Sequence, residues 1–155
     1  MPITSAGILM YRHNDGGLQV LLAHPGGPFW QRRDDGAWML PKGERVPGEA
    51  AEETARREFE EELGAPATGE LHSLGRLRQR GGKWVEAFAL EGRFDPAALH
   101  SNLFELEWPP HSGRRASFAE IDRVAWFTLA QAREKILPSQ VELLDRLESH
   151  LSRGR

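Results

Sequence analysis

Residues 56–64, which read RREFEEELG, place four glutamates within five consecutive positions. On a helical wheel with about 100° per residue, Glu58, Glu61 and Glu62 share one face, whereas Glu60 points roughly the opposite way. Like charges at this spacing repel each other, and the partial negative charge of a helix C-terminus adds a similar penalty. Clustered carboxylate oxygens without cysteine or histidine suit hard cations such as Mg²⁺ and Mn²⁺, which are frequent partners in phosphate chemistry. The spacing therefore indicates a divalent-cation site.

A solvated acidic face is the structural alternative for the same helix. Glu53 lies four residues before Arg57, a spacing at which opposite charges pair on a helix. Arg56 and Glu60 have the same spacing. Such pairs would explain the arginines, but they would leave the other three glutamates of the stretch without a cation on the helix.

The helix that positions these carboxylates is predicted over residues 49–63. Its first turns are acidic, which suits the positive end of the helix dipole. Gly64 stands where a C-terminal capping glycine belongs, and Pro66 follows as a stop. An apolar stripe at i, i+4 spacing is expected to face the core and consists of Ala51, Ala55, Phe59 and Leu63. The acidic face therefore borders the core.

Strands are predicted around this helix. Residues 3–12 and 18–25 are predicted to be strands joined by the turn sequence HNDGG. Two further strands, at residues 70–80 and 83–92, are predicted to flank a Gly-Gly hairpin turn. A short extended segment is expected at residues 37–41, and a last strand at 122–129.

Two helices are predicted near the C-terminus, over residues 129–136 and 139–151, the second with an apolar face formed by Val141, Leu144, Leu147 and Leu151. Residues 92–119 have no clear period apart from a possible strand at 103–108. This order of elements predicts an α/β fold with a mixed sheet packed by helices and without a βαβαβ rhythm.

Composition limits the classes of protein that remain. A length of 155 residues predicts a single domain, residues 1–155, and 39% hydrophobic with 28% charged residues is ordinary for a soluble globular chain. The net charge of −3 argues against bulk nucleic-acid binding, and the absence of cysteine excludes thiol chemistry and disulfides. The N-terminus lacks the features of a signal peptide, and no apolar run approaches the roughly 20 residues that span a bilayer. We therefore expect a cytoplasmic protein without a membrane partner.

The segment 43–65 reads GERVPGEAAEETARREFEEELGA and matches the pattern G-x5-E-x7-R-E-U-x-E-E-x-G-U, where U is a bulky apolar residue. This pattern resembles the Nudix box. The matching residues are Gly43, Glu49, Arg57, Glu58, Phe59, Glu61, Glu62 and Gly64. One position departs from the pattern: Ala65 stands where the family prefers a larger aliphatic residue, which affects local packing but removes no chemical group.

The resemblance implies a loop–helix–loop motif on an α/β/α sandwich. It also implies hydrolysis of a pyrophosphate bond in a nucleoside diphosphate linked to another moiety. By position, Glu58, Glu61 and Glu62 would bind Mg²⁺, with Mn²⁺ as a substitute, and a backbone carbonyl near Lys42 or Gly43 would complete a metal site.

The same resemblance assigns supporting roles. Arg57 would orient Glu58, and Glu49 would brace the loop and helix. A general base must accept the proton of the attacking water, and in this family it often lies outside the box. Our candidate is Glu120, just before the last predicted strand, and the rivals are Glu86, Glu105 and Glu107.

Candidate substrate-binding residues lie outside the box. Lys42, in the sequence WMLPKGE, would meet a phosphate, and its PKG entry is similar to that of the branch that cleaves diadenosine polyphosphates. Tryptophans are candidate stacking surfaces for a base, namely Trp30, Trp38, Trp84 and Trp108. Arginine pairs could grip a polyphosphate bidentately, namely Arg32 with Arg33 and Arg114 with Arg115. The loops HPGGPFW and WPPHSGRR are similar to those of a bacterial Nudix subgroup described as NTP pyrophosphohydrolases.

Three functions remain open from the sequence. The first is Mg²⁺-dependent hydrolysis of a small nucleotide substrate, a dinucleoside polyphosphate or an NTP. The second is a Nudix module that binds a nucleotide and regulates without turnover, and the third is an interaction domain with a structural acidic helix. The oligomeric state is open, with a homodimer as one option.

Overall fold

In the computed structural model, which describes residues 4–153, a six-stranded mixed sheet is built around β1 (Thr4–Asn14). Side chains alternate along this strand, so Ala6, Ile8 and Met10 enter one core while Leu9 and Tyr11 enter another. The strand order is β4 (His72–Arg78), β5 (Trp84–Glu91), β1, β2 (Gly17–Pro25) and β8 (Ile121–Thr128). β5 runs parallel to β1, whereas β2 is antiparallel to it.

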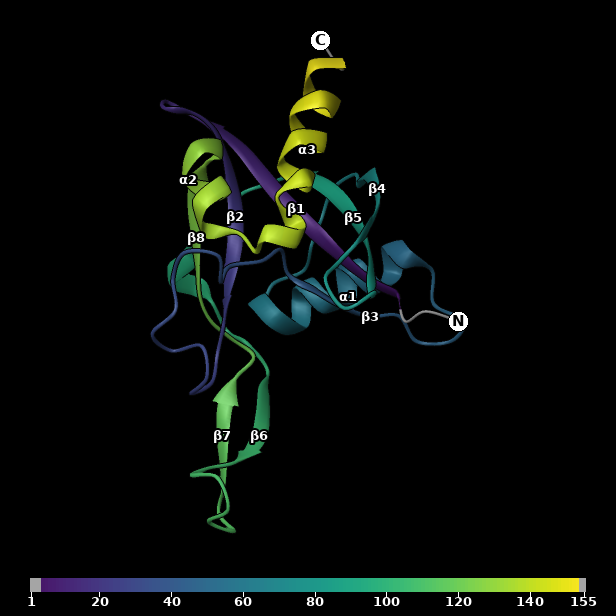
Figure 1. Ribbon diagram of the computed structural model, residues 1–155. Helices are drawn as coiled ribbons and strands as arrows, with labels where there is room; N and C mark the ends of the chain where they lie inside the picture. The colour runs from purple at the N-terminus through teal and green to yellow at the C-terminus, as the bar shows by residue number, and fades with distance from the viewer. Residues whose placement is uncertain (1–3, 154–155) are drawn as a thin grey trace.

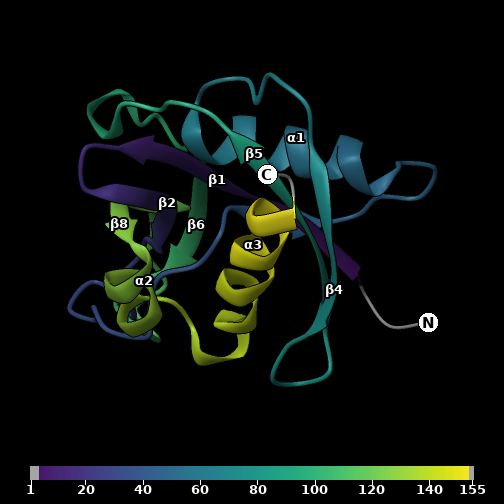
Figure 2. The same cartoon turned by 90° about the horizontal axis from the view of Figure 1, so that it is seen from above.

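Helices cover both faces of the sheet, which gives the α/β/α sandwich (Figures 1 and 2). α1 (Ala51–Leu63) packs on one face through Ala55, Phe59 and Leu63. α2 (Leu129–Lys135) and α3 (Glu142–Arg153) pack on the other, where the buried residues of α3 are Leu143, Leu144 and Leu147. Short 3₁₀ turns are formed at Pro96–Ala98 and Pro138–Gln140. The expected α/β class and mixed sheet are confirmed.

β3 (Lys42–Glu44) pairs antiparallel with the first residues of β1 and so brings the segment before α1 onto the sheet. The extended segment expected at residues 37–41 makes isolated bridges instead, from Met39 to Ala23 and from Trp38 to Ile136. The regular strand begins one residue beyond it, at Lys42.

The acidic helix begins two residues later than the sequence pattern indicates. Ala50 is extended, with φ −72° and ψ 154°, and Gly48 has φ 86°, so the chain is still turning at Glu49. Glu49 therefore lies in the loop, from which its side chain can reach back to the helix. The predicted end is confirmed, because Gly64 adopts a left-handed conformation with φ 86° and closes the helix.

A second, two-stranded sheet lies outside the main one. β6 (Leu103–Glu107) pairs antiparallel with β7 (Arg115–Ala119), and the resulting hairpin projects away from the body of the molecule (Figure 1). The strand predicted at 103–108 is confirmed, whereas β7 was not predicted, because its sequence RASFA is short and follows a polar, glycine-containing turn. Among the described residues, none forms a helix long and apolar enough to cross a membrane.

Candidate active site

Gly43 lies directly beneath the carboxylate of Glu58. A Cβ atom added at position 43 would collide with the carboxyl carbon and both carboxylate oxygens of Glu58. A larger residue at position 43 would therefore push the Glu58 carboxylate out of its place over the backbone of residue 43.

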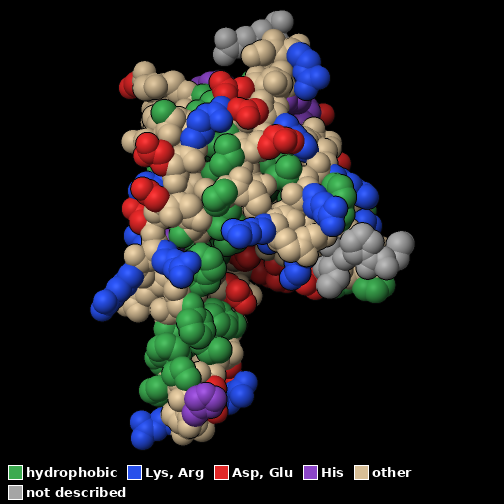
Figure 3. Space-filling model, in the orientation of Figure 1, with side chains coloured by type: hydrophobic (Ala, Val, Ile, Leu, Met, Phe, Trp, Pro, Cys, Tyr) green, Lys and Arg blue, Asp and Glu red, His purple; other side chains and the backbone are tan. Residues whose placement is uncertain are grey.

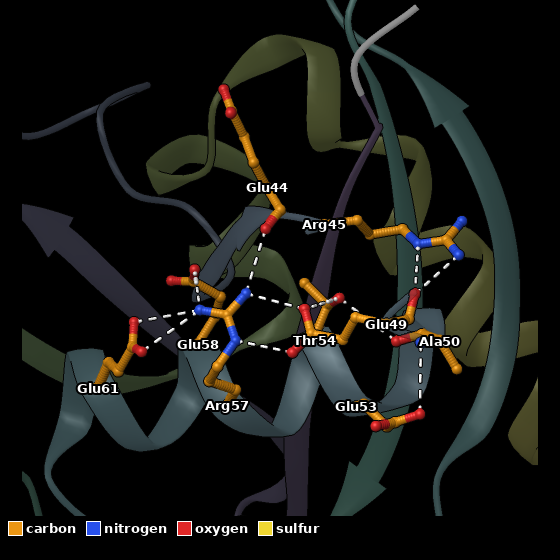
Figure 4. A network of polar contacts seen from close by, with 9 residues as sticks. All are labelled: Glu44, Arg45, Glu49, Ala50, Glu53, Thr54, Arg57, Glu58 and Glu61. Atoms are coloured by element: carbon orange, nitrogen blue, oxygen red, sulfur yellow. Dashed lines mark hydrogen bonds and ion pairs between the residues drawn. The ribbon is translucent and has the colours of Figure 1, made fainter. Parts of the chain in front are cut away.

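Arg57 holds several of the acidic groups in place (Figure 4). Its guanidinium donates to both carboxylate oxygens of Glu49, from Nε at 2.8 Å and from Nη2 at 2.9 Å. Nη1 donates to Oε1 of Glu58 at 3.0 Å and to Oε1 of Glu61 at 3.3 Å, and Nη2 also reaches the carbonyl of Glu44 at 3.2 Å. One arginine thus links the loop, the helix and the end of β3.

Glu49 is correspondingly fixed in its charged form. The hydrogen bonds from Arg57 and then from Thr54, whose Oγ1 donates to Glu49 at 2.6 Å, lower the pKa of Glu49 to about 2. Thr54 is fully buried. The sequence analysis did not predict a role for Thr54, although its hydroxyl stands next to Ala55 of the apolar stripe.

The ion pairs of the structural alternative do not form. Glu53 accepts a long hydrogen bond from the backbone N–H of Ala50, at 3.4 Å, instead of pairing with Arg57. Arg56 turns away from Glu60 and donates to the backbone carbonyls of Ala67 at 2.6 Å and Gly69 at 2.8 Å. The i, i+4 pair that does form joins Arg57 to Glu61, which was expected to have no cation on the helix, and within the described residues Glu58 and Glu62 still have no i, i+4 partner.

Glu62 is the least satisfied acid of this group. Its Oε2 is buried and has no hydrogen-bond partner among the described residues. Burial, and then the charge of Glu58, raise the pKa of Glu62 to about 8, while the Lys42 ammonium opposes the shift. Burial and the charge of Glu61 also raise the pKa of Glu58. An unpaired carboxylate in such a place is costly unless a proton or a cation accompanies it.

Glu120 lies close to this cluster. Its charge contributes to the raised pKa of both Glu58 and Glu62. Two backbone hydrogen bonds fix Glu120 there. The N–H of Glu120 donates to the carbonyl of Asn102 at 2.9 Å, and the N–H of Asn102 donates to the carbonyl of Glu61 at 3.0 Å. Asn102 falls in the stretch without a periodic pattern, and the sequence held no signal for this contact.

The rival acids are engaged elsewhere. Glu86 accepts from Arg76 at 3.0 Å across β4 and β5, and Glu105 accepts from Arg115 at 3.3 Å on the projecting hairpin. Glu107 accepts from the backbone N–H of His111 at 3.1 Å at the hairpin tip. Of the four acids proposed from the sequence, Glu120 is therefore the one that the fold brings to the acidic face of α1.

The donor set fits a hard divalent cation. Within residues 4–153, no three acidic or histidine side chains converge tightly enough to form a finished coordination sphere. The Oε2 atom of Glu62 nevertheless has no hydrogen-bond partner among the described residues, and the pKa of Glu58 stays raised although Arg57 pairs with it. Glu61 is 44% exposed, and its carboxylate accepts from Nη1 of Arg57 at 3.3 Å. Carboxylate oxygens are the ligands that Mg²⁺ and Mn²⁺ prefer.

Lys42 lies beside the acidic cluster at the start of β3. Burial lowers the pKa of its ammonium, and the charges of Glu62, Glu44 and Glu58 act in the opposite direction. A half-buried cation next to clustered carboxylates can meet an anionic group that enters with a metal ion.

Trp38 is not a stacking surface for a ligand, which corrects the expectation from the sequence. The ring is 4% exposed and belongs to the core on the α2 and α3 side, on the face of the sheet opposite α1. Its indole N–H donates to Asp34 at 2.8 Å, and its ring meets Phe127 edge to face at 5.0 Å. No face of the ring is open to a nucleotide.

The candidate arginines lie in exposed loops. The guanidinium of Arg33 stands 5.4 Å from the ring centroid of Trp30 in the loop after β2. Arg114 and Arg115 are exposed on the hairpin, where Arg115 pairs with Glu105 across the strands.

Comparison with known proteins gives one family and several related folds. A model described as the NUDIX domain matches residues 1–147. No curated protein matches the chain.

Several solved structures share the fold. Ap4A hydrolase from C. elegans, as a binary complex, is 22% identical over 96% of this chain and 98% of that one, with a TM-score of 0.66. The NUDIX domain of NrtR from Shewanella oneidensis, complexed with ADP ribose, is 18% identical over 97% and 89%, with a TM-score of 0.69. A MutT protein from Methanosarcina mazei Go1 is 20% identical over 96% and 95%, with a TM-score of 0.63.

Proposed function

Because the chain belongs to the NUDIX domain family and is an enzyme acting on phosphorus anhydrides, we propose that it hydrolyses nucleotide pyrophosphate bonds with Mg²⁺. Mn²⁺ is the proposed substitute. The observation that carries the metal requirement is the buried, unpartnered Oε2 of Glu62 beside Glu58, whose own pKa is raised by burial. This charge is stable in the folded protein only with a proton or a cation next to it.

Each residue of the site has its own proposed role. Glu58, Glu61 and Glu62 would hold the ion, which neutralises phosphate charge and lowers the pKa of a bound water. Arg57 keeps Glu58 oriented through the hydrogen bond at 3.0 Å and is itself held by Glu49. Lys42 would bind a phosphate oxygen. Catalysis then depends mainly on positioning and electrostatics at phosphorus.

Glu120 is the proposed general base. It is held at the base of the hairpin by the backbone contact to Asn102 and acts electrostatically on two of the proposed metal ligands. A carboxylate at this place can accept the proton of the attacking water.

The proposed substrate is a dinucleoside polyphosphate or an NTP. The PKG entry to the box supports the first, as does the likeness to an Ap4A hydrolase. The alternative is a nucleotide-binding module without turnover. The complete set Arg57, Glu58, Glu61 and Glu62 argues against it, because binding alone does not need all four.

The test is a hydrolysis assay with Mg²⁺ and a panel of dinucleoside polyphosphates, NTPs, ADP-ribose and diphosphoinositol phosphates. We expect turnover of at least one substrate that falls by orders of magnitude in Glu61→Gln and Glu62→Gln. Glu60→Gln is the matched control, because this exposed acid lies on the other side of α1 and should retain activity. Equal turnover in all four proteins would refute the metal assignment, whereas binding without turnover would support the module.

A further inference from the structure

The projecting hairpin has one polar and one apolar face. Because successive residues of a strand point to opposite sides, one face carries the exposed residues Leu103, Glu105, Glu107, Arg115 and Ser117. The other carries the half-buried residues Phe104, Leu106, Ala116 and Phe118 and continues into Trp108. An isolated two-stranded hairpin is marginally stable in water, so this apolar face requires something to pack against.

The loop after β2 covers part of the apolar face. Phe29 meets Trp108 edge to face, with ring centroids 5.5 Å apart, and a Cβ atom on Gly27 would lie 3.0 Å from the ring of Phe104. Even so, Phe29 remains 63% exposed. We call Phe29, Phe104 and Trp108 the aromatic surface.

Buried His24 holds this loop in place. Its Nδ1 lies 2.8 Å from the carboxylate of Asp122, and its Nε2 lies 2.6 Å from the carbonyl of Arg33. The loop that carries Phe29 is thus tied at its far end to β8, which limits its freedom to move away from the hairpin.

The base of the hairpin is hydrogen-bonded to the segments that carry the acidic site. The N–H of Gly26, just before Gly27, donates to the carbonyl of Glu120 at 2.9 Å, and the N–H of Asn102, just before β6, donates to that of Glu61 at 3.0 Å. In Figure 3, hydrophobic side chains form a strip along the hairpin, and acidic side chains gather where the hairpin meets the body. The aromatic surface therefore begins, at Phe104, on the segment whose first residues are hydrogen-bonded to Glu61 and Glu120.

Two arginines lie on the same two segments as the aromatic surface, the loop after β2 and the hairpin. Arg33 stacks near Trp30 in the covering loop, and Arg114 is exposed at the hairpin turn. This combination of ring faces and guanidinium groups matches a ligand that contains both an aromatic base and phosphate.

On these grounds we propose that the aromatic surface binds a nucleobase of the substrate by stacking, while the phosphates lie at the acidic site. This inference rests on the proposed function. The small size of the aromatic surface favours a small ligand over a second copy of the chain. Its three rings are far fewer than the roughly 20–30 residues that each side of a stable protein interface contributes.

The experiment compares Phe29→Ala and Trp108→Ala with the wild type and with Leu103→Ala. Leu103 is a matched control, because it is 65% exposed on the same hairpin but on the opposite face. For a nucleotide that the wild type hydrolyses, we expect KM to rise about tenfold in both aromatic variants, with kcat within about twofold. Leu103→Ala should leave KM unchanged.

A base-free probe separates stacking from a general effect. Inorganic tripolyphosphate should bind the wild type and the aromatic variants equally by calorimetry, whereas ATP should bind the variants more weakly. An equal loss for both ligands, or an unchanged KM, would overturn the proposal. A change from dimer to monomer in Phe29→Ala by light scattering would also overturn it in favour of an interface between copies. Absence of turnover in the wild type would count against the proposed function alone, because the calorimetric comparison does not need turnover.

Discussion

Glu60 and Glu62 differ in environment although only one residue separates them on the same helix. Glu60 is exposed, whereas Glu62 faces Lys42 across the junction of α1 and β3 and has a buried oxygen without a partner in the described part of the chain. The difference follows from the helical repeat, which turns one side chain to water and the other toward the sheet. All of these residues are glutamates, so the environment of each depends on the direction in which its side chain projects from α1.

The raised pKa of Glu62 predicts a pH-dependent stability in metal-free solution. Because its pKa is about 8 in the folded protein and 4.5 as the ordinary value, the folded state binds the proton more tightly. The free energy of unfolding should thus fall as pH rises from about 4.5 through 8, by a few kcal/mol in total.

Thermal unfolding in EDTA at a series of pH values measures this effect. Glu62→Gln, which cannot lose a proton, should be more stable than the wild type at pH 8 and no more stable at pH 5. Parallel pH profiles for the two proteins would show that Glu62 is not the group responsible.

Gly43 predicts a second effect at the scale of one residue. In Gly43→Ala the new methyl group would displace the carboxylate of Glu58, so we expect kcat to fall at least about tenfold while the circular dichroism spectrum is retained. Gly16→Ala is the control, because a Cβ atom at Gly16 meets nothing within 4 Å. Wild-type activity in Gly43→Ala would mean that Glu58 need not lie over the backbone of residue 43.

At the scale of the element, the end of α1 connects the acidic helix to the hairpin. Gly64 has φ 86°, and a Cβ atom there would lie 2.6 Å from the carbonyl oxygen of His100, whose N–H donates to Leu63 at 3.0 Å. Both the turn and the close approach require glycine.

Gly64→Ala should therefore lower the free energy of unfolding by about 1–3 kcal/mol. Gly81→Ala separates the two causes, because Gly81 has φ 92° but open space around it and should cost less. Urea unfolding of both variants gives the comparison, and an equal loss would assign the whole effect to backbone conformation.

Elements with local signals could be predicted, and those defined by distant contacts could not. The stripe ending at Leu63 and the glycine after it predicted α1, and the alternation around Gly81 and Gly82 predicted the β4–β5 hairpin. β7 was missed, because its residues alternate over only five positions after a polar turn. The sequence indicated the shared face of Glu58, Glu61 and Glu62, but the burial of Glu62 depends on β3, which packs across from it.

Trp38 illustrates the same limit for a single side chain. A tryptophan between apolar neighbours fits both a core position and a ligand surface, and the sequence cannot say which side of the sheet it faces. Its backbone N–H donates to the carbonyl of Lys135 at 2.9 Å, a contact nearly 100 residues away in the chain that places it in the core beneath α2.

At the scale of the whole molecule, the sheet separates α2 and α3 on one face from α1, which carries the proposed metal ligands, on the other. Apolar residues form a core on each face of the sheet, one beneath α2 and α3 and one beneath α1, and the two helical layers are seen in Figure 2. The charges of Glu58 and Glu62 on α1 act on Lys42 at the start of β3. A cation bound at that edge would link α1, β3 and the segment around Glu120, and a ligand that binds only the folded state raises its stability.

The most direct test of the central claim is the change in melting temperature with Mg²⁺ concentration, measured at pH 8 for the wild type, Glu60→Gln and Glu62→Gln. Divalent-cation binding at the acidic face predicts a rise of several degrees in the wild type and in Glu60→Gln, and a much smaller rise in Glu62→Gln. The same rise in all three proteins, or none in the wild type, would contradict a cation site at Glu62.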